Sequence, residues 1–192
     1  SDLEKTGLRQ KVANMLADMK KTEIVLKGTE NKSISLDYIL PSKIKGPIVL
    51  YAHGFNGFKD WGGMDLVAAE FAKKGMPFIK FNFSHNGGTV EQPIDFPDLE
   101  AFGQNNYSKE SDDLNSVIDW VHENLLSITK AKLDDFSLVG HSRGGGITTI
   151  KAEEDARVKK LISLAGVSDF RSRFNEGTDE LKIGRKLELN LF

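Results

Sequence analysis

Residues 140–144 read Gly-His-Ser-Arg-Gly and form the segment of this chain best suited to do chemistry. The apolar run 136–139 before it predicts a strand, and the run 147–152 after it predicts a helix. A serine at a sharp strand-to-helix turn exposes its hydroxyl, and the glycines on either side are needed because side chains there would collide. The pattern therefore predicts Ser142 as a nucleophile for acyl transfer, held in a strained conformation with positive φ.

Residues 53–57 read His-Gly-Phe-Asn-Gly and directly follow the apolar run 48–52, which predicts a buried strand. Attack of a serine on a carbonyl carbon creates an oxyanion that two hydrogen-bond donors must stabilise. We expect these donors to be the backbone N–H groups of Arg143, which follows the nucleophile, and of Phe55, where Gly54 lets the backbone approach closely. The two motifs, each placed after a buried strand, indicate a hydrolase far more strongly than either does alone.

Three further side chains are accessory candidates for the same site. His53 precedes the oxyanion glycine, and we expect it to tie loops together. His85 lies near the end of the predicted strand 76–83, where a loop-bracing role is favoured over one facing the site. Asp169 follows the predicted strand 158–165, and a helix cap is favoured for it over a catalytic acid, because no histidine is available to orient. No spacing of His, Asp or Glu indicates a metal site, and no Lys-Ser/Thr follows the glycine run 144–146 as a phosphate loop requires. We expect neither metal nor cofactor.

The elements that must position these residues follow from the hydrophobic periodicity. It predicts an amphipathic N-terminal helix over 1–21, followed by an α/β domain over 22–192 with a largely parallel sheet, helices on both faces and six readable strands. Residues 84–107 form one long irregular stretch. The expected strands are 23–26 and 33–40 as a hairpin, then 48–52, 76–83, 136–139 and 158–165, and the expected helices of the domain are 65–74, 112–126 and the one after Ser142.

Composition excludes several classes of function. The 192 residues are 39% hydrophobic and 28% charged, with a net charge of −2 and no cysteine. These values favour a single globular domain without disulfides or thiol chemistry, and they do not favour a nucleic-acid or membrane partner. No apolar run approaches the ~20 residues that span a bilayer. We expect a soluble, cytoplasmic protein; secretion after removal of a leader stays open because the chain begins at Ser1.

The stretch 23–169 resembles the α/β-hydrolases of the dienelactone-hydrolase or feruloyl-esterase-like type. The segments that carry the resemblance are 53–55, 82–87 (Asn-Phe-Ser-His-Asn-Gly) and 140–145. The resemblance implies an eight-stranded, mostly parallel sheet and a Ser-His-Asp triad whose acid follows the seventh strand and whose histidine follows the eighth. This chain departs from that pattern after Asp169: only residues 170–192 remain, and none of its four histidines follows Ser142. We therefore expect the C-terminal strands to be incomplete.

Two functions of different classes are compatible with this sequence. The first is a serine hydrolase that acts on a small carboxylic ester through an acyl-serine intermediate, either with its base unidentified or with segments of an intact enzyme omitted from the sequence. The alternative is a catalytically impaired or truncated hydrolase-fold protein that serves as a binding or interaction module. The strand 158–165 would then expose a sheet edge. The tail 186–192 alternates polar and apolar residues, so we expect it to cover an edge of its own sheet or of a second copy in a homodimer, with a helix over 179–191 as the alternative.

Overall fold

The computed structural model describes Gln10, residues 20–125 and residues 136–169. The expected N-terminal helix lies outside the described residues except for Gln10, which is helical, and for Lys20 and Lys21, which belong to a strand instead. The tail 186–192, with its expected strand or helix, also lies outside them.

The six strands described form one mixed sheet in the order β1-β2-β4-β3-β5-β6, which confirms the predicted α/β class. The first two strands form an antiparallel hairpin, β2 pairs antiparallel with β4, and the remaining pairs are parallel. The bounds are Lys20–Lys27 for β1, Ser33–Leu40 for β2, Ile48–Ala52 for β3, Phe78–Phe81 for β4, Phe136–His141 for β5 and Val158–Leu164 for β6.

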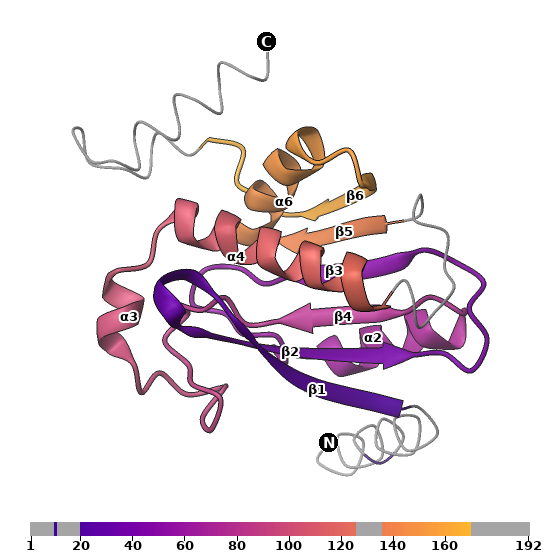
Figure 1. Cartoon of the computed structure of the whole chain (residues 1–192), viewed down its shortest axis with the longest axis horizontal. Helices are drawn as coiled ribbons and strands as arrows, with labels where there is room; N and C mark the ends of the chain where they lie inside the picture. The colour runs from indigo at the N-terminus through magenta and orange to yellow at the C-terminus, as the bar shows by residue number, and fades with distance from the viewer. Residues whose placement is uncertain (1–9, 11–19, 126–135, 170–192) are drawn as a thin grey trace, which may run out of the picture.

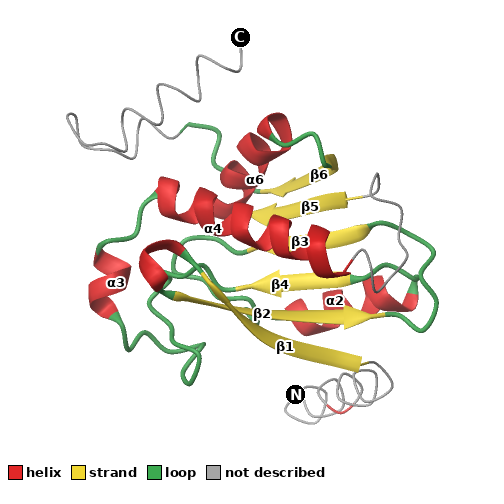
Figure 2. Ribbon diagram, in the orientation of Figure 1, coloured by secondary structure: helices red, strands yellow, loops and turns green. Residues whose placement is uncertain are grey.

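Helices cover both faces of this sheet (Figure 2). Helix α4 and the π-helical turn that continues it pack with α6 on one face, and α2 packs on the other. The short helix α3 lies beyond the carboxyl ends of the parallel strands (Figure 1). The bounds are Met64–Lys73 for α2, Leu99–Gly103 for α3, Tyr107–Trp120 for α4, Val121–Leu125 for the π-helical turn and Arg143–Glu154 for α6.

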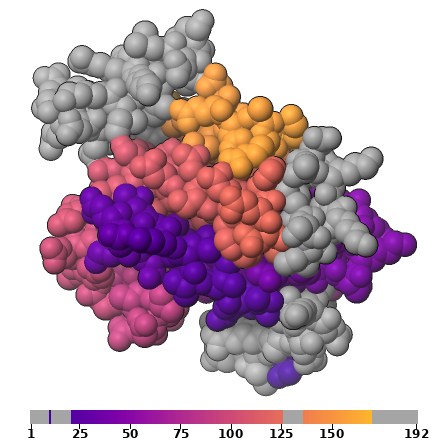
Figure 3. All heavy atoms as spheres, viewed as in Figure 1, coloured from indigo at the N-terminus to yellow at the C-terminus, as the bar shows by residue number. Residues whose placement is uncertain are grey.

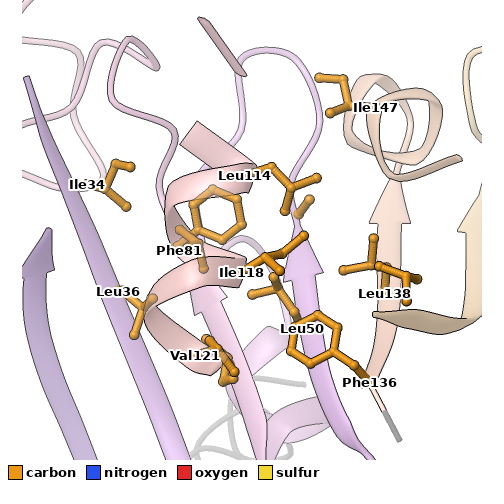
Figure 4. Packing of buried hydrophobic residues seen from close by; sticks show 14 of the residues in the cluster. Ile34, Leu36, Leu50, Phe81, Leu114, Ile118, Val121, Phe136, Leu138 and Ile147 are labelled. Carbon is orange, nitrogen blue, oxygen red and sulfur yellow. The ribbon is translucent and has the colours of Figure 1, made fainter. Parts of the chain in front are cut away.

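The main core lies between the sheet and α4 (Figure 4). Leu114 and Ile118 of α4 pack on apolar side chains that alternate along the strands, among them Leu36, Leu50 and Phe81, and all five are at most 1% exposed. Burial of each such side chain contributes roughly 1.5–3 kcal/mol to stability. This core holds α4 firmly against the strands whose carboxyl ends carry the candidate site.

Two helix starts differ from the prediction because polar caps, rather than apolar periodicity, set them. Helix α4 begins at Tyr107, before the predicted start at 112, because the Asn106 side chain accepts a hydrogen bond from the Lys109 N–H. The stretch 84–107 is not wholly irregular, because Asp98 caps α3 by accepting from the Ala101 N–H. The other helices and strands of the domain begin and end within a few residues of the predicted bounds.

Candidate active site

Ser142 lies between the end of β5 and the start of α6 with φ 53° and ψ −115°, which confirms the predicted strained turn. Its backbone is held from both sides. The Ser142 N–H donates to the Leu164 carbonyl at 2.9 Å, and the Ser142 carbonyl accepts from the N–H groups of Val167 at 3.0 Å and Gly146 at 3.2 Å. Non-glycine residues in such a conformation persist only where their surroundings enforce it, and they cluster at functional sites.

The glycines on either side of Ser142 are required by close packing, as the sequence predicts. A Cβ atom on Gly140 would overlap the Thr148 hydroxyl and the Gly144 carbonyl, and one on Gly144 would overlap the carbonyl oxygens of Ala52 and His53. The start of α6 is therefore pressed directly against the end of β3. This contact brings the loop after β3 to the nucleophile.

The loop 53–57 lies against the turn that carries Ser142. A Cβ atom on Gly54 would be 3.1 Å from the Ser142 Cβ and 3.1 Å from the His141 carbonyl oxygen. Next to it, Phe55 is 60% exposed. Within the described part of the chain, the N–H groups of Phe55 and Arg143 donate to no backbone or side-chain acceptor. The loop that carries Gly54 and Phe55 thus lies beside the turn that carries the serine.

The Arg143 side chain leaves the turn toward α4. Its Nε donates to Glu110 Oε2 at 2.6 Å, and Asn105 Nδ2 donates to the other carboxylate oxygen at 2.7 Å. Its guanidinium carbon is 3.9 Å from the Tyr107 ring centre and 5.7 Å from that of Phe55. Burial raises the pKa of the Glu110 carboxyl, and the positive charge of Arg143 acts in the opposite direction.

Glu110 is not among the site residues predicted from the sequence, although a signal for it exists. Glu110 belongs to the same helical stripe as Leu114, Val117 and Val121, all of which are buried. A carboxylate on an apolar stripe must find a partner, because an unpaired buried charge is costly. The partner itself could not be predicted, because Arg143 lies 33 residues away in the sequence.

His53 braces loops, which is the role that the sequence favours. It is buried, and its Nε2 accepts from the Phe83 N–H at 3.2 Å while Nδ1 lies 2.8 Å from the Gly54 carbonyl oxygen. Because Nε2 is the acceptor, Nδ1 carries the proton and donates to Gly54. Burial lowers the pKa of His53 to about 4. Both ring nitrogens are committed to the backbone, so His53 does not face Ser142 as a base.

His85 is also engaged away from Ser142. Its Nδ1 lies 2.8 Å from the Ser84 hydroxyl and its Nε2 3.2 Å from Glu30 Oε2, in the turn between β1 and β2. Lys109 of α4 donates to the same Glu30 oxygen at 2.8 Å. The ring therefore joins the β4 loop to the hairpin turn and to α4, in agreement with the favoured loop-bracing role.

Two further ionisable side chains, His122 and Asp169, form no hydrogen bond with the serine hydroxyl. His122 is exposed in the π-helical turn, at the opposite end of α4 from Tyr107. Asp169 is exposed and is the last residue described before the tail, so its role as acid or cap stays a prediction. No described side chain forms a hydrogen bond with the Ser142 hydroxyl. Among the residues that the structure describes, no group of His, Asp and Glu could hold a metal ion.

A cluster of buried charges, also missed from sequence, holds the loop after β3 on the α2 face of the sheet. Lys59 Nζ donates to Asp37 at 2.8 Å and to Asp60 at 2.6 Å, and Lys80 contacts Asp60 as well. Each charge is compensated, which buried charges require.

A cavity of about 240 Å³ adjoins the cluster and is lined by Lys21, Glu23, Ile24, Val25, Ser35, Asp37, Lys59, Asp60, Val90 and Pro93.

Comparison with known proteins shows the fold. The sequence matches no protein-family model and no curated protein. The structure is similar to the dienelactone hydrolase from Anabaena variabilis ATCC 29413, with a TM-score of 0.63 and 21% identity over 79% of this chain and 65% of that one. It is also similar to the α/β-hydrolase GrgF from Penicillium sp. sh18, with a TM-score of 0.61 and 19% identity over 90% of this chain and 53% of that one.

A third similar structure is the Pyrococcus furiosus esterase Pf2001, with a TM-score of 0.58 and 16% identity over 78% of this chain and 53% of that one. The chain therefore spans between half and two thirds of the length of these three proteins. Within the described residues, no helix is both long and apolar enough to cross a membrane. The chain has the α/β-hydrolase fold.

Proposed function

We propose that this chain, which has the α/β-hydrolase fold, is a serine hydrolase that acts on carboxylic esters through an acyl-Ser142 intermediate. The observation that carries the proposal is the strained turn at Ser142, with the Gly54 loop packed against it. A positive φ at a serine has no use in a turn that only joins a strand to a helix, where glycine would serve without strain. It does have a use where the hydroxyl must project above the sheet.

The reaction follows from this geometry. The Ser142 oxygen attacks the carbonyl carbon of the ester, and the carbonyl oxygen becomes an oxyanion that accepts from the N–H groups of Phe55 and Arg143. The bond to the alcohol oxygen then breaks, the alcohol leaves with a proton, and the acyl group stays on Ser142. Water next attacks the acyl carbon, releases the carboxylic acid and restores the serine hydroxyl.

The identity of the base sets the expected rate. Because His53 and His85 are committed to other contacts, the serine proton passes to water or to a buffer base in this proposal. An oxyanion hole and substrate binding without a base still accelerate hydrolysis by about 10³–10⁴ over water. We therefore expect weak but real esterase activity from the 192-residue chain, well below the usual kcat of ~1–10³ s⁻¹.

Hydrolysis of p-nitrophenyl acetate by the chain and by Ser142→Ala tests this proposal. We expect slow turnover that falls to the uncatalysed rate in the variant. Equal rates for the two proteins would overturn the nucleophile assignment. A kcat in the ordinary range that Ser142→Ala abolishes would show that an efficient base exists, and His85→Ala would be the first variant to make.

The second candidate is a binding or interaction module built on the same fold. It is favoured by one observation: all four histidines lie among the described residues, and none of them forms a hydrogen bond with the Ser142 hydroxyl. The two candidates differ in what the ester does at the site. If the protein is a binding module, the unchanged chain and Ser142→Ala bind the ester, or its carboxylate product, with equal affinity. Neither protein then releases p-nitrophenol above background.

A further inference from the structure

We propose that Arg143 is a positioning residue whose side chain, clamped by Glu110 and Tyr107, holds the two oxyanion donors in place. This inference rests on the proposed function, because it assigns a task to a side chain whose own backbone N–H is one of the donors. The Phe55 ring, which belongs to the residue that carries the other donor, lies against the same guanidinium. A single side chain therefore contacts both halves of the oxyanion hole.

The clamp fixes the guanidinium in three directions. Glu110 Oε2 accepts from Nε at 2.6 Å, Asn105 Nδ2 donates to the other oxygen of that carboxylate at 2.7 Å, and the guanidinium carbon lies over the Tyr107 ring at 3.9 Å from its centre. The Arg143 and Glu110 side chains are only 14% and 4% exposed, so water screens their attraction weakly. Such a pair holds one geometry, unlike an ion pair at the surface.

The guanidinium is one member of a row of ring contacts that runs from α4 to the segment around α3. From Tyr107 the row passes through Arg143 to Phe55, then to Phe102 at 5.5 Å and to Phe96 at a further 5.7 Å. Its members come from α4, the start of α6, the β3 loop and the segment around α3. Phe55 is 60% exposed, so its position depends on these ring contacts. The row ties the oxyanion loop to the helix that begins at the nucleophile.

The Arg143 Nη2 atom is buried without a hydrogen-bond partner among the described residues. A residue present for stability alone would have its donors satisfied, because an unpaired buried donor is destabilising. The arrangement is instead explained by a planar group that lies over two rings and pairs through one nitrogen. Lysine cannot replace it in this task, because an ammonium group does not stack flat on aromatic rings.

The test follows acylation of Ser142 by p-nitrophenyl acetate in the full chain and in Arg143→Met, Arg143→Lys and Glu110→Gln. Two quantities are determined for each variant: the acylation rate at saturating ester, and the ester concentration that gives half of that rate. We expect the saturating rate to fall about 10²-fold in Arg143→Met, the size of effect seen on loss of one oxyanion donor, with the half-saturating concentration unchanged. The saturating rate should fall less in Glu110→Gln. It should stay low in Arg143→Lys, as in Arg143→Met.

The matched control is Arg157→Met, which removes a guanidinium paired with Asp155 and Asp119 outside the site. It should acylate at the rate of the unchanged chain. Thermal unfolding midpoints of all variants separate positioning from folding: a rate loss fully accounted for by the unfolded fraction would overturn the proposal. The proposal would also be overturned if Arg143→Met and Glu110→Gln acylated Ser142 at the rate of the unchanged chain. Undiminished acylation in Ser142→Ala would instead remove the proposed function itself.

Discussion

At the scale of single residues, the strain at Ser142 is carried by its neighbours. Backbone hydrogen bonds, one donated to Leu164 and two accepted from Gly146 and Val167, fix the residue in a conformation that costs about 1–3 kcal/mol on its own. The glycines then allow the end of β3, the turn and the start of α6 to meet. The nucleophile position is thus a property of backbone packing, and it should respond to changes that never touch the hydroxyl.

Gly144→Ala tests this dependence on packing. The new Cβ would overlap the carbonyl oxygens of Ala52 and His53, so we expect the unfolding free energy to fall by about 1–3 kcal/mol and Ser142 acylation to slow. Gly103→Ala is the control, because a Cβ there meets no atom within 4 Å. Urea unfolding followed by circular dichroism measures both. Equal stabilities for the two variants would contradict the close packing at the turn.

His53 makes stability depend on pH. Its folded pKa is lowered to about 4, while the unfolded imidazole titrates near 6.5. Between pH 6.5 and 4 the unfolded chain therefore binds a proton at His53 that the folded chain does not bind. The unfolding free energy is highest above pH 6.5 and falls by about 3 kcal/mol in total as pH falls toward 4. Comparison with His53→Gln over this range isolates the effect. A variant whose unfolding free energy varies with pH as steeply as that of the unchanged chain would contradict it.

At the scale of elements, the first turns of α4 join the site to the rest of the fold. Asp113 is fully buried and accepts from the Thr29 N–H at 2.9 Å, the Thr29 hydroxyl at 3.0 Å and the Ser84 N–H at 2.7 Å. Glu110, one turn earlier, holds Arg143. One helix thus connects the hairpin turn, the β4 loop and the turn that carries the nucleophile.

Two adjacent aspartates of α4 test this connecting role. Asp113→Ala leaves the Thr29 and Ser84 N–H groups without an acceptor and removes one partner of the Thr29 hydroxyl, so we expect it to lower the unfolding free energy by about 3 kcal/mol. Asp112→Ala should change it by less than about 0.5 kcal/mol, because Asp112 is exposed. Chemical denaturation of both variants measures the difference. Comparable effects at the two positions would show that the Asp113 contacts contribute little to stability.

The elements differ in how much of them the sequence could predict, for physical reasons. Strand β3 and the turn at Ser142 were predictable because apolar runs and paired glycines act locally. The start of α4 was not, since a polar residue, Asn106, caps it outside the apolar pattern. The contacts of Glu110 with Arg143 and of Asp113 with Thr29 and Ser84 could not be predicted either, because they join residues 29 to 84 positions apart and depend on the assembled sheet.

At the scale of the whole molecule, β6 is an edge strand of the described sheet. It forms one end of the described surface together with α6 (Figure 3). Leu161, Ile162 and Leu164 are 36–49% exposed, which is unusual for apolar residues of a parallel strand. Strands with unpaired edges invite pairing with a further strand. We propose that this edge is where a second copy of the chain, or a further segment, associates.

Deletion of residues 186–192 tests whether the tail takes part in this association. We expect the full chain to form a dimer whose mass in solution falls with dilution, and the shortened chain to lose the dimer or to become less soluble. Light scattering after size-exclusion chromatography measures the mass of each. A monomer mass and a solubility that the deletion leaves unchanged would remove the tail from this role.

The measurement that tests the central claim most directly is the site of acylation. The chain is incubated with p-nitrophenyl acetate, quenched in acid and digested, and the acetylated peptides are identified by mass spectrometry. We expect the acetyl group on Ser142, and its absence from the same peptide of Ser142→Ala. An acetyl group found on other side chains alone, or no adduct at Ser142 while p-nitrophenol is released above background, would contradict an acyl-serine reaction at this site.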